Sequence, residues 1–333
     1  MAAQIVRRAL MYVPSSSKRM LEKSRSMRVD TVAYDLEDSV TLGKKAEARQ
    51  NLKELLQQPK PDGIKELCVR INSVDSGLAL QDLQEVLQAP SLDAIMLPKC
   101  QSASDLHFIT DVIQHLSPDR HSMGTPSTSS SFYSSSSSSS SSSRPPLRII
   151  ALIESAKAIQ NLPQITAASP YLSGLVFAAE DFAKDMSLTR TPSLTEFLYA
   201  RSAIATAARA AELSSTIDLV CTAYKGSEGL KTLEEECLNG KGLGFNGKQC
   251  IHPSQIEVCQ RAFSPGEQEL QWAVRVLVAD EKADRAGRGA WTLDGKMIDK
   301  PVVGKAMEVV KRAEVCEMDV EALRERWSRQ EPE

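Results

Sequence analysis

The sequence has no uninterrupted apolar run that approaches the roughly 20 residues of a membrane-spanning helix, which argues against a helical membrane protein. It also lacks an excess of charge of either sign, since 40 Lys and Arg residues face 43 Asp and Glu residues. The resulting net charge of −3 gives no general attraction to nucleic acid or to a membrane surface. A phosphorylated ligand would therefore need a local basic cluster.

Cysteine pairs with the spacing of a metal site or a redox motif are also missing. The seven cysteines are odd in number and scattered, at positions 68, 100, 221, 237, 250, 259 and 316. This usage predicts reduced cysteines in the core of an intracellular protein, not a disulfide framework or a zinc site. Because a strand-like segment begins by residue 9, we expect no secretory signal and a cytoplasmic protein.

What the chain does have is the composition of a folded protein with a sizeable core, with 333 residues of which 42% are hydrophobic and 25% charged. Short apolar runs alternate with longer amphipathic segments. The apolar runs predict strands near residues 9–13, 31–36, 67–71, 94–97, 148–153, 174–179, 216–220 and 248–251. Since parallel strands need crossover connections, this alternation predicts an α/β fold, a closed (β/α)8 TIM barrel. An open doubly wound sheet is the alternative.

Two segments stand outside this alternation. Residues 122–146 form a serine-rich insertion of low complexity, and its composition predicts a disordered surface loop. Residues 263–333 are too few for a second barrel-sized domain. We expect a C-terminal extension with helices and a hairpin, which packs on the barrel of residues 1–262 or on a neighbouring subunit.

Polar side chains collect where the predicted strands end. In a parallel barrel these ends form one rim, and that rim carries the chemistry. Nearly every predicted strand contributes to the set, which comprises Tyr12, Lys18, Arg19, Lys23, Asp35, Glu37, Asp38, Arg70, Asn72, Lys99, Glu154, Glu180, Asp181, Asp218 and His252. So many functional groups on one rim predict a ligand site there.

Glu154 and Asp181 follow strongly apolar strands, so we expect both at the floor of a pocket. Two neighbouring carboxylates repel each other, which raises the pKa of one of them unless a cation neutralises the pair. Mg²⁺ fits this requirement, because it prefers oxygen ligands and keeps positions open for substrate. A salt bridge to Arg70 or Lys99 is the alternative. With no second histidine on this rim, His252 is expected to orient a loop or contact the ligand.

Gly242, Gly244 and Gly247 match the dinucleotide-binding fingerprint G-x-G-x-x-G. That fingerprint requires a strand before it and a helix after it. Here a helical segment precedes the glycines and a predicted strand follows them. We therefore interpret them as a helix stop in a helix-to-strand connection, and not as a nicotinamide site.

Motifs along the chain resemble those of the HpcH/HpaI aldolase and citrate lyase β-subunit family. They include RRALMYVP, YDLEDSV, VRIN, IMLPK, LIESA, AAEDF, GFNGKQCIHPSQI and GKMID, in one unbroken order. The resemblance covers nearly the whole chain outside the insertion. It implies a TIM barrel that assembles as a homotrimer or a dimer of trimers, and it adds the mitochondrial matrix as an alternative location.

The resemblance also implies an activity, the Mg²⁺-dependent cleavage of a carbon–carbon bond in a 3-hydroxyacyl-CoA thioester. The implied substrate is citramalyl-CoA, which would give pyruvate and acetyl-CoA, and the reverse reaction would be a malate-synthase-like condensation. Malyl-CoA, methylmalyl-CoA or a citryl thioester is an alternative substrate. A non-catalytic barrel that serves as a binding or scaffold protein is an alternative of another class.

Residue roles are implied motif by motif. Glu154 and Asp181 would hold the metal, Arg70 would contact the reacting carboxylate or oxyanion, and Asp299 would be the catalytic acid/base, supplied by a neighbouring subunit. The CoA-thioester site would be lined by Tyr12, Arg19, Lys23, Ile251 and His252. The shape of the acyl pocket stays open, because the chain departs from the family pattern at Ser15, Ser39, Lys157, Ala158 and Ala178.

Overall fold

The computed structural model describes residues 5–120 and 145–333, and in it eight parallel strands pair in sequence order into a closed barrel. β1 pairs with β2 on one side and with β8 on the other, which closes the ring. The predicted (β/α)8 barrel is therefore confirmed, and the open sheet is excluded. The strands are β1 (Ala9–Pro14), β2 (Val29–Asp35), β3 (Ile64–Arg70), β4 (Ala94–Leu97), β5 (Arg148–Ile153), β6 (Leu172–Phe177), β7 (Ser215–Asp218) and β8 (Gly247–Cys250).

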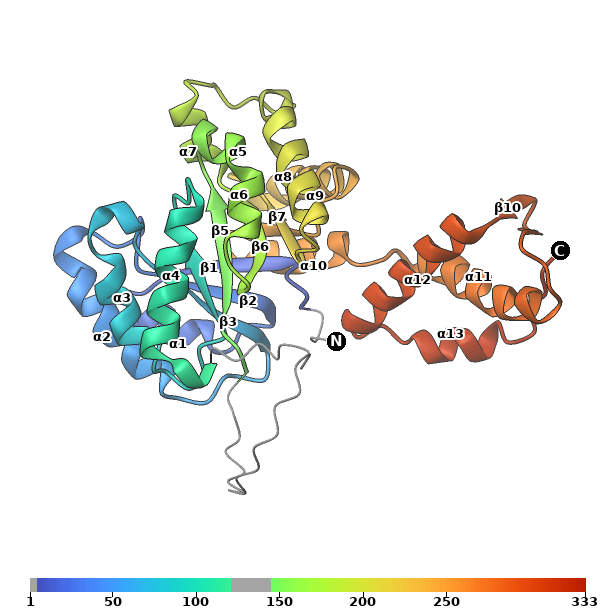
Figure 1. Ribbon diagram of the computed structural model, residues 1–333, viewed down its shortest axis with the longest axis horizontal. Helices are drawn as coiled ribbons and strands as arrows, with labels where there is room; N and C mark the ends of the chain where they lie inside the picture. The colour runs from blue at the N-terminus through green and yellow to red at the C-terminus, as the bar shows by residue number, and fades with distance from the viewer. Residues whose placement is uncertain (1–4, 121–144) are drawn as a thin grey trace, which may run out of the picture. The chain divides into compact units, whose positions relative to one another are not determined.

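Helices surround the strands of the barrel (Figure 1). The helices of the barrel are α1 (Lys18–Ser24), α2 (Lys45–Leu56), α3 (Ala79–Val86), α4 (Ala103–Leu116), α5 (Ala156–Gln160), α6 (Leu162–Ala167), α7 (Ala179–Asp185), α8 (Leu198–Ala210), α9 (Gly226–Gly242) and α10 (Ile256–Phe263), with short 3-10 helices η1 (Leu42–Lys44), η2 (Val74–Ser76), η3 (Pro118–Arg120), η4 (Thr195–Phe197) and η5 (Pro253–Gln255). Their starts follow local sequence signals. At the start of α4, for example, the carboxylate of Asp105 accepts the backbone N–H of Ser102 at 2.9 Å, as a capping box requires.

The interior of the barrel is packed with side chains. Because strand residues alternate between the two faces, every second residue points inward. The buried inward set consists of Leu10, Ala33, Cys68, Ala94, Met96, Ile150, Leu152, Val176 and Ile217. This apolar layer supports the polar residues at the carboxyl ends of the strands.

The predicted strand bounds differ from the observed ones at both ends of several strands, and the largest difference is at the start of β3. β3 begins at Ile64, three residues before the predicted start, since Lys65 and Glu66 hide it from a search for apolar runs. Glu66 lies inside the amino end of the barrel, where Arg7 neutralises its charge with two hydrogen bonds of 2.7 Å. A charged residue can thus occupy a strand interior when its partner comes from far away in the sequence.

The glycine-rich segment connects α9 to β8, which confirms that it is a helix-to-strand connection. α9 ends at Gly242, and Gly244 has a φ of +98°, which favours glycine. A Cβ atom on Gly247 would lie 1.8 Å from the carbonyl oxygen of Arg7, so only glycine fits there. These glycines serve the fold.

The chain divides into two compact units, Arg7–Cys259 and a second unit that holds Gln260–Glu333 with Ile5 and Val6. The second unit contains α11 (Glu267–Arg285), the antiparallel hairpin of β9 (Trp291–Leu293) and β10 (Lys296–Ile298), α12 (Lys300–Val315) and α13 (Val320–Arg326). It has a hydrophobic core of its own, which includes Leu270, Val274, Trp291, Leu293, Ile298, Ala306 and Val310. The helical C-terminal extension with a hairpin is confirmed.

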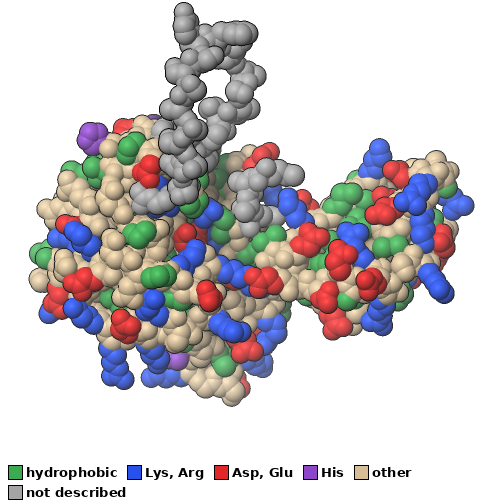
Figure 2. All heavy atoms as spheres, turned by 90° about the horizontal axis from the view of Figure 1, so that it is seen from below, with side chains coloured by type: hydrophobic (Ala, Val, Ile, Leu, Met, Phe, Trp, Pro, Cys, Tyr) green, Lys and Arg blue, Asp and Glu red, His purple; other side chains and the backbone are tan. Residues whose placement is uncertain are grey.

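Several composition-based predictions can be compared with the structure. All seven cysteines are free, and six of them are buried. No helix in residues 5–120 and 145–333 is both long and apolar enough to cross a membrane. On the face drawn in Figure 2, basic and acidic side chains are interspersed, as the balanced charge predicts. The serine-rich insertion predicted at 122–146 lies, except for its last two residues, outside the described residues.

Candidate active site

A cavity of about 270 Å³ opens at the carboxyl ends of β4, β5 and β6. It contains both carboxylates that the sequence assigned to a metal. The residues that line it are Lys99, Gln101, Glu154, Ser155, Asp181, Lys184 and Asp185. All of them follow a strand end, so the cavity lies on the rim where the sequence predicts the ligand site.

Glu154 lies in the corner between β5 and α5. The next residue, Ser155, caps α5 by accepting the backbone N–H of Ala158 at 3.2 Å, so the chain turns directly after the carboxylate. Only 5% of Glu154 is exposed. Burial raises the pKa of Glu154 to about 8, and the nearby charges of Glu37 and Asp181 act in the same direction.

Asp181 lies in the first turn of α7 and is half-buried. Within the described residues neither Asp181 nor Glu154 forms an ion pair, although Lys99 and Lys184 line the same cavity. Arg70 pairs with Asp35, and Lys99 pairs with Glu37. The alternative of a salt bridge between the two carboxylates and Arg70 or Lys99 is therefore not what the structure contains.

The donor chemistry of Glu154 and Asp181 fits Mg²⁺. This ion is held by one or two carboxylates together with water and substrate oxygens, and a buried carboxylate without a counter-cation favours it. Within the described residues, no group of three or more His, Cys, Asp or Glu side chains is placed to hold a metal. The cavity also offers space for substrate or water oxygens, and Gln101 and Ser155 line it.

Arg70, the last residue of β3, is held rigidly. Its Nε and Nη2 atoms each donate to the carboxylate of Asp35 at 2.7 Å, and Nη1 lies 3.1 Å from Oε2 of Glu37. Its guanidinium lies 4.8 Å from the ring centroid of Tyr12. Ser39, one of the departures from the family pattern, donates its backbone N–H to Asp35 at 3.0 Å. Although burial opposes it, the hydrogen bonds from Arg70 hold the pKa of Asp35 below its usual value.

Lys99 connects this charged cluster to Glu154. It has a φ of +50°, a left-handed backbone that non-glycine residues adopt at a cost of about 1–3 kcal/mol. Its backbone N–H donates to Glu154, while its ammonium contacts the carboxylates of Glu37 and, at 3.3 Å, Asp38. Burial raises the pKa of Glu37 even though two cations oppose the shift. The sequence did not predict that Lys99 contacts both Glu154 and the carboxylates that follow β2.

Two residues of the predicted rim point elsewhere, which corrects the prediction. Asp218 ends β7, but its side chain is fully buried between the barrel and its helices, where Arg201 donates to it at 2.6 Å. Asn72 is also buried and donates to Asp82 at 2.6 Å. Strand alternation explains Asp218, because the residue before it, Ile217, points into the barrel.

The residues that the resemblance assigns to the CoA-thioester site lie around the rim but are not gathered in the cavity. Arg19 and Lys23 are exposed on α1, and Ile251 and His252 are exposed directly after β8. His252 stacks on Tyr224 with 5.3 Å between ring centroids.

Asp299 belongs to the second unit. It is half-buried and caps α12, where its Oδ1 accepts the backbone N–H of Val302 at 3.1 Å. Oδ1 of Asp299 thus caps the helix, and Oδ2 does not take part in the cap.

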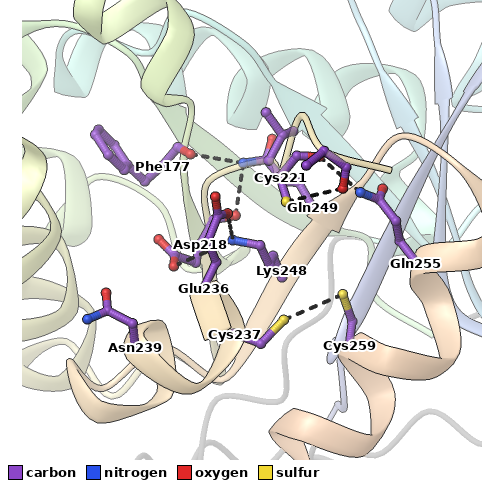
Figure 3. A network of polar contacts seen from close by, with 12 residues as sticks. Phe177, Asp218, Cys221, Glu236, Cys237, Asn239, Lys248, Gln249, Gln255 and Cys259 are labelled. Carbon is purple, nitrogen blue, oxygen red and sulfur yellow. Dashed lines mark hydrogen bonds and ion pairs between the residues drawn. The ribbon is translucent and has the colours of Figure 1, made fainter. Parts of the chain in front are cut away.

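Sequence reasoning missed Gln249 altogether. It lies in β8 next to Leu10 of the inward layer, so its side chain points into the barrel. Figure 3 shows its amide nitrogen bound to the backbone oxygens of Phe177 and Asp218. A polar residue at an inward position of a strand is the signal that could have found it.

Comparison with known proteins identifies the class of this barrel. A family model described as HpcH/HpaI aldolase/citrate lyase matches residues 8–253. The chain belongs to this family, which confirms the resemblance in its motifs.

Individual relatives span nearly the whole chain. "Citramalyl-CoA lyase, mitochondrial" from Homo sapiens is 33% identical over 93% of this chain and 86% of its own length. "Citrate lyase subunit beta" from Haemophilus influenzae is 35% identical over 92% of this chain and 97% of its own. A solved structure of the protein CitE from Mycobacterium tuberculosis, in complex with magnesium, acetoacetate and coenzyme A, is 28% identical with a TM-score of 0.67 and covers 92% of this chain and 97% of that one.

Proposed function

We propose that this protein is a Mg²⁺-dependent carbon–carbon lyase that cleaves citramalyl-CoA into pyruvate and acetyl-CoA. The observation that carries the proposal is the pair Glu154 and Asp181, two carboxylates that form no ion pair and line one cavity of a barrel of this family. A relative of that activity and a magnesium and coenzyme A complex of a related barrel support it.

Residues of this chain would stabilise the charge on the substrate and on the enolate product. When bound by Glu154 and Asp181, Mg²⁺ would supply charge stabilisation for the hydroxyl and carboxylate oxygens of the substrate. Arg70, held on one edge by Asp35, presents its remaining N–H groups to the substrate carboxylate or to the enolate oxygen.

Proton transfer completes the reaction. The hydroxyl of citramalyl-CoA loses its proton, the bond from the carbinol carbon to the methylene carbon breaks, and pyruvate leaves. The electron pair of that bond forms the enolate of acetyl-CoA, which takes up a proton at carbon. We assign the acid/base role to Asp299, whose Oδ2 is not used by the helix cap.

The test is to incubate the purified full chain with citramalyl-CoA and to measure pyruvate and acetyl-CoA separately, with Mg²⁺ and with EDTA. We expect equal amounts of both products, formed only with Mg²⁺. A citryl, malyl or methylmalyl thioester is the alternative substrate, because relatives named for citrate lyase and malyl-CoA thioesterase match the chain about equally well. If one of these thioesters is cleaved in preference to citramalyl-CoA, its acyl group is the one that the enzyme accepts. Cleavage of none would leave a binding or scaffold protein.

We further propose that the enzyme is a cyclic homo-oligomer in which Asp299 acts on the barrel of a neighbouring subunit. The support is that Asp299 lies in a separately folded unit, whereas the carboxylate pair lies in the barrel. Mixing inactive Asp299→Ala subunits with inactive Glu154→Ala subunits tests this, because random assembly makes about one composite site in four complete. Activity that returns from two inactive parents supports the proposal. A mixture as inactive as its parents contradicts it.

The compartment is a prediction of the same kind. The sequence predicts the cytoplasm, and the family resemblance implies the mitochondrial matrix as the alternative; a human relative is named as mitochondrial. Fractionation of cells that produce the chain distinguishes them.

A further inference from the structure

Gln249 is buried inside the barrel, with 3% of its surface exposed, and its amide group is fully engaged. Its Nε2 donates to the carbonyl of Phe177 at 2.9 Å and to that of Asp218 at 3.0 Å. These carbonyls end β6 and β7, so one side chain joins three strands just below the rim (Figure 3). A buried amide that uses both of its N–H groups has one defined orientation.

That orientation fixes the proton of Tyr12. Two carbonyl oxygens can only accept, so the nitrogen of Gln249 must face them and its Oε1 must face Tyr12 at 2.9 Å. The amide oxygen cannot donate, so the hydroxyl of Tyr12 is the donor. The hydrogen bond therefore holds the Tyr12 side chain from its far end.

The ring of Tyr12 in turn supports Arg70. The guanidinium lies 4.8 Å from the ring centroid, within the range of a cation–π contact. Asp35 holds one edge of the guanidinium at 2.7 Å, Glu37 lies 3.1 Å from its Nη1 atom, and the Tyr12 ring contacts one face of it. Gln249 does not contact Arg70 in this arrangement.

We propose that Gln249 is a positioning residue of the active site, which acts through the Tyr12 hydroxyl to fix the plane of the Arg70 guanidinium. This inference rests on the proposed function in assigning Arg70 to the substrate. Its consequence is that two residues in different strands, β8 and β1, act on turnover as one unit. Gln249 also holds Phe177 and Asp218, so a purely structural role is the competing explanation.

The experiment is a double-mutant cycle of Gln249→Met, Tyr12→Phe and both together, in the full chain with Mg²⁺. Each single change removes the same hydrogen bond and keeps a side chain of similar size. We expect each to lower kcat about tenfold with a smaller change in KM, and the double variant to be no slower than either single one. Tyr12→Leu, which also removes the ring, should be slower than Tyr12→Phe.

Effects that multiply in the double variant, to about a hundredfold, would overturn the proposal, because the two residues would then act independently. A large effect of Gln249→Met with none of Tyr12→Phe would also overturn it and leave the structural role. Tyr12→Phe keeps every bond of Gln249 to the strands, so it remains informative if Gln249→Met folds poorly.

A second measurement does not depend on activity. In protein labelled with ¹⁵N-arginine, the Nε–H signal of Arg70, assigned with Arg70→Lys, should shift or broaden in both single variants. The Nε–H signal of Arg7, held by Glu66 at the amino end of the barrel, is the internal control and should not change. Unchanged Arg70 signals contradict the inference. An inactive parent protein whose Arg70 signal responds as expected would instead contradict only the proposed function.

Discussion

The two ends of the barrel both bury charge, but they neutralise it differently. At the amino end both buried carboxylates are neutralised by guanidinium groups, with Arg7 bound to Glu66 at 2.7 Å, Arg148 at 3.6 Å from Glu66, and Arg8 bound to Asp30 at 2.8 Å. Arg7 also donates to hydroxyl groups at the starts of β6 and β7.

At the carboxyl end, carboxylates outnumber their cations. Arg70 and Lys99 form ion pairs with Asp35, Glu37 and Asp38, whereas Glu154 and Asp181 form none. Buried carboxylates that are paired with guanidinium groups, as at the amino end, here called the matched end, stabilise the fold. Carboxylates left without an ion pair, as at the carboxyl end, here called the unmatched end, create a site for a ligand. The predictions below test this difference.

The largest effect is expected at the unmatched end. Glu154→Gln or Asp181→Asn should lower kcat/KM by roughly a thousandfold or more, because each removes a charged ligand that the proposed Mg²⁺ site needs. The melting temperature should not fall, since a neutral amide is less costly to bury than an unpaired carboxylate. Steady-state kinetics over a Mg²⁺ titration and thermal unfolding check both statements.

Glu180→Gln is the matched control, because Glu180 neighbours Asp181 but is exposed and pairs with Arg190. It should retain turnover within about twofold of the parent. Parental turnover of Glu154→Gln at limiting Mg²⁺ would show that the metal assignment is wrong.

The opposite outcome is expected at the matched end. Glu66→Gln leaves Arg7 buried without a counter-charge, so it should lower the free energy of unfolding by about 3–5 kcal/mol. The turnover of the folded fraction should not change. Urea unfolding measures the loss, and Glu85→Gln, which breaks the exposed pair with Lys53, should cost at most about 1 kcal/mol. Equal losses in the two variants would remove the distinction between buried and exposed pairs.

The same pair predicts a pH dependence. Burial alone would raise the pKa of Glu66, but the Arg7 guanidinium holds this pKa below the usual value of a glutamate side chain. A depressed pKa stabilises the fold fully above the unfolded value, and the stabilisation is lost as the pH falls through the lower folded value. The stability gap between the parent and Glu66→Gln should therefore be constant near neutral pH and shrink below about pH 4.5. A gap that widens on acidification would mean that the sign of the shift is wrong.

The smallest effect is expected from the serine-rich insertion. It connects η3 to the start of β5, so it joins the barrel at the matched end. Deletion of residues 127–143 should change neither the melting temperature nor kcat/KM measurably, because a serine-rich segment buries little apolar surface. A clear loss of turnover would show that this segment contributes to the active rim.

The fold was largely predictable because its signals are local. Apolar runs such as Arg148–Ile153 and Ala94–Leu97 coincide with β5 and β4, and the glycines near 242–247 were correctly placed between a helix and a strand. The prediction was wrong where a charged residue such as Glu66 lies in a strand, because its partner Arg7 is 59 residues away.

The candidate site was predictable only in part. Glu154 follows an apolar strand and lines the cavity as expected, but Asp218 follows one too and points away from the rim. The two residues differ in the face of the strand from which the side chain projects. The exact position of each residue along its strand decides this, and apolar runs do not locate that position. Gln249 escaped notice for a related reason, since its role depends on carbonyls of β6 and β7.

By itself, the sequence determined the number and order of the strands, the rim on which polar residues gather, and the family to which the chain belongs. These follow from periodicity and short motifs, which act over a few neighbouring residues. Only the tertiary structure decided which charges are matched. Closing the barrel brings Arg7 to Glu66 and Arg70 to Asp35, and leaves Glu154 and Asp181 without a cation. Charge pairing depends on distance in space, and that distance is set by the closed ring of strands.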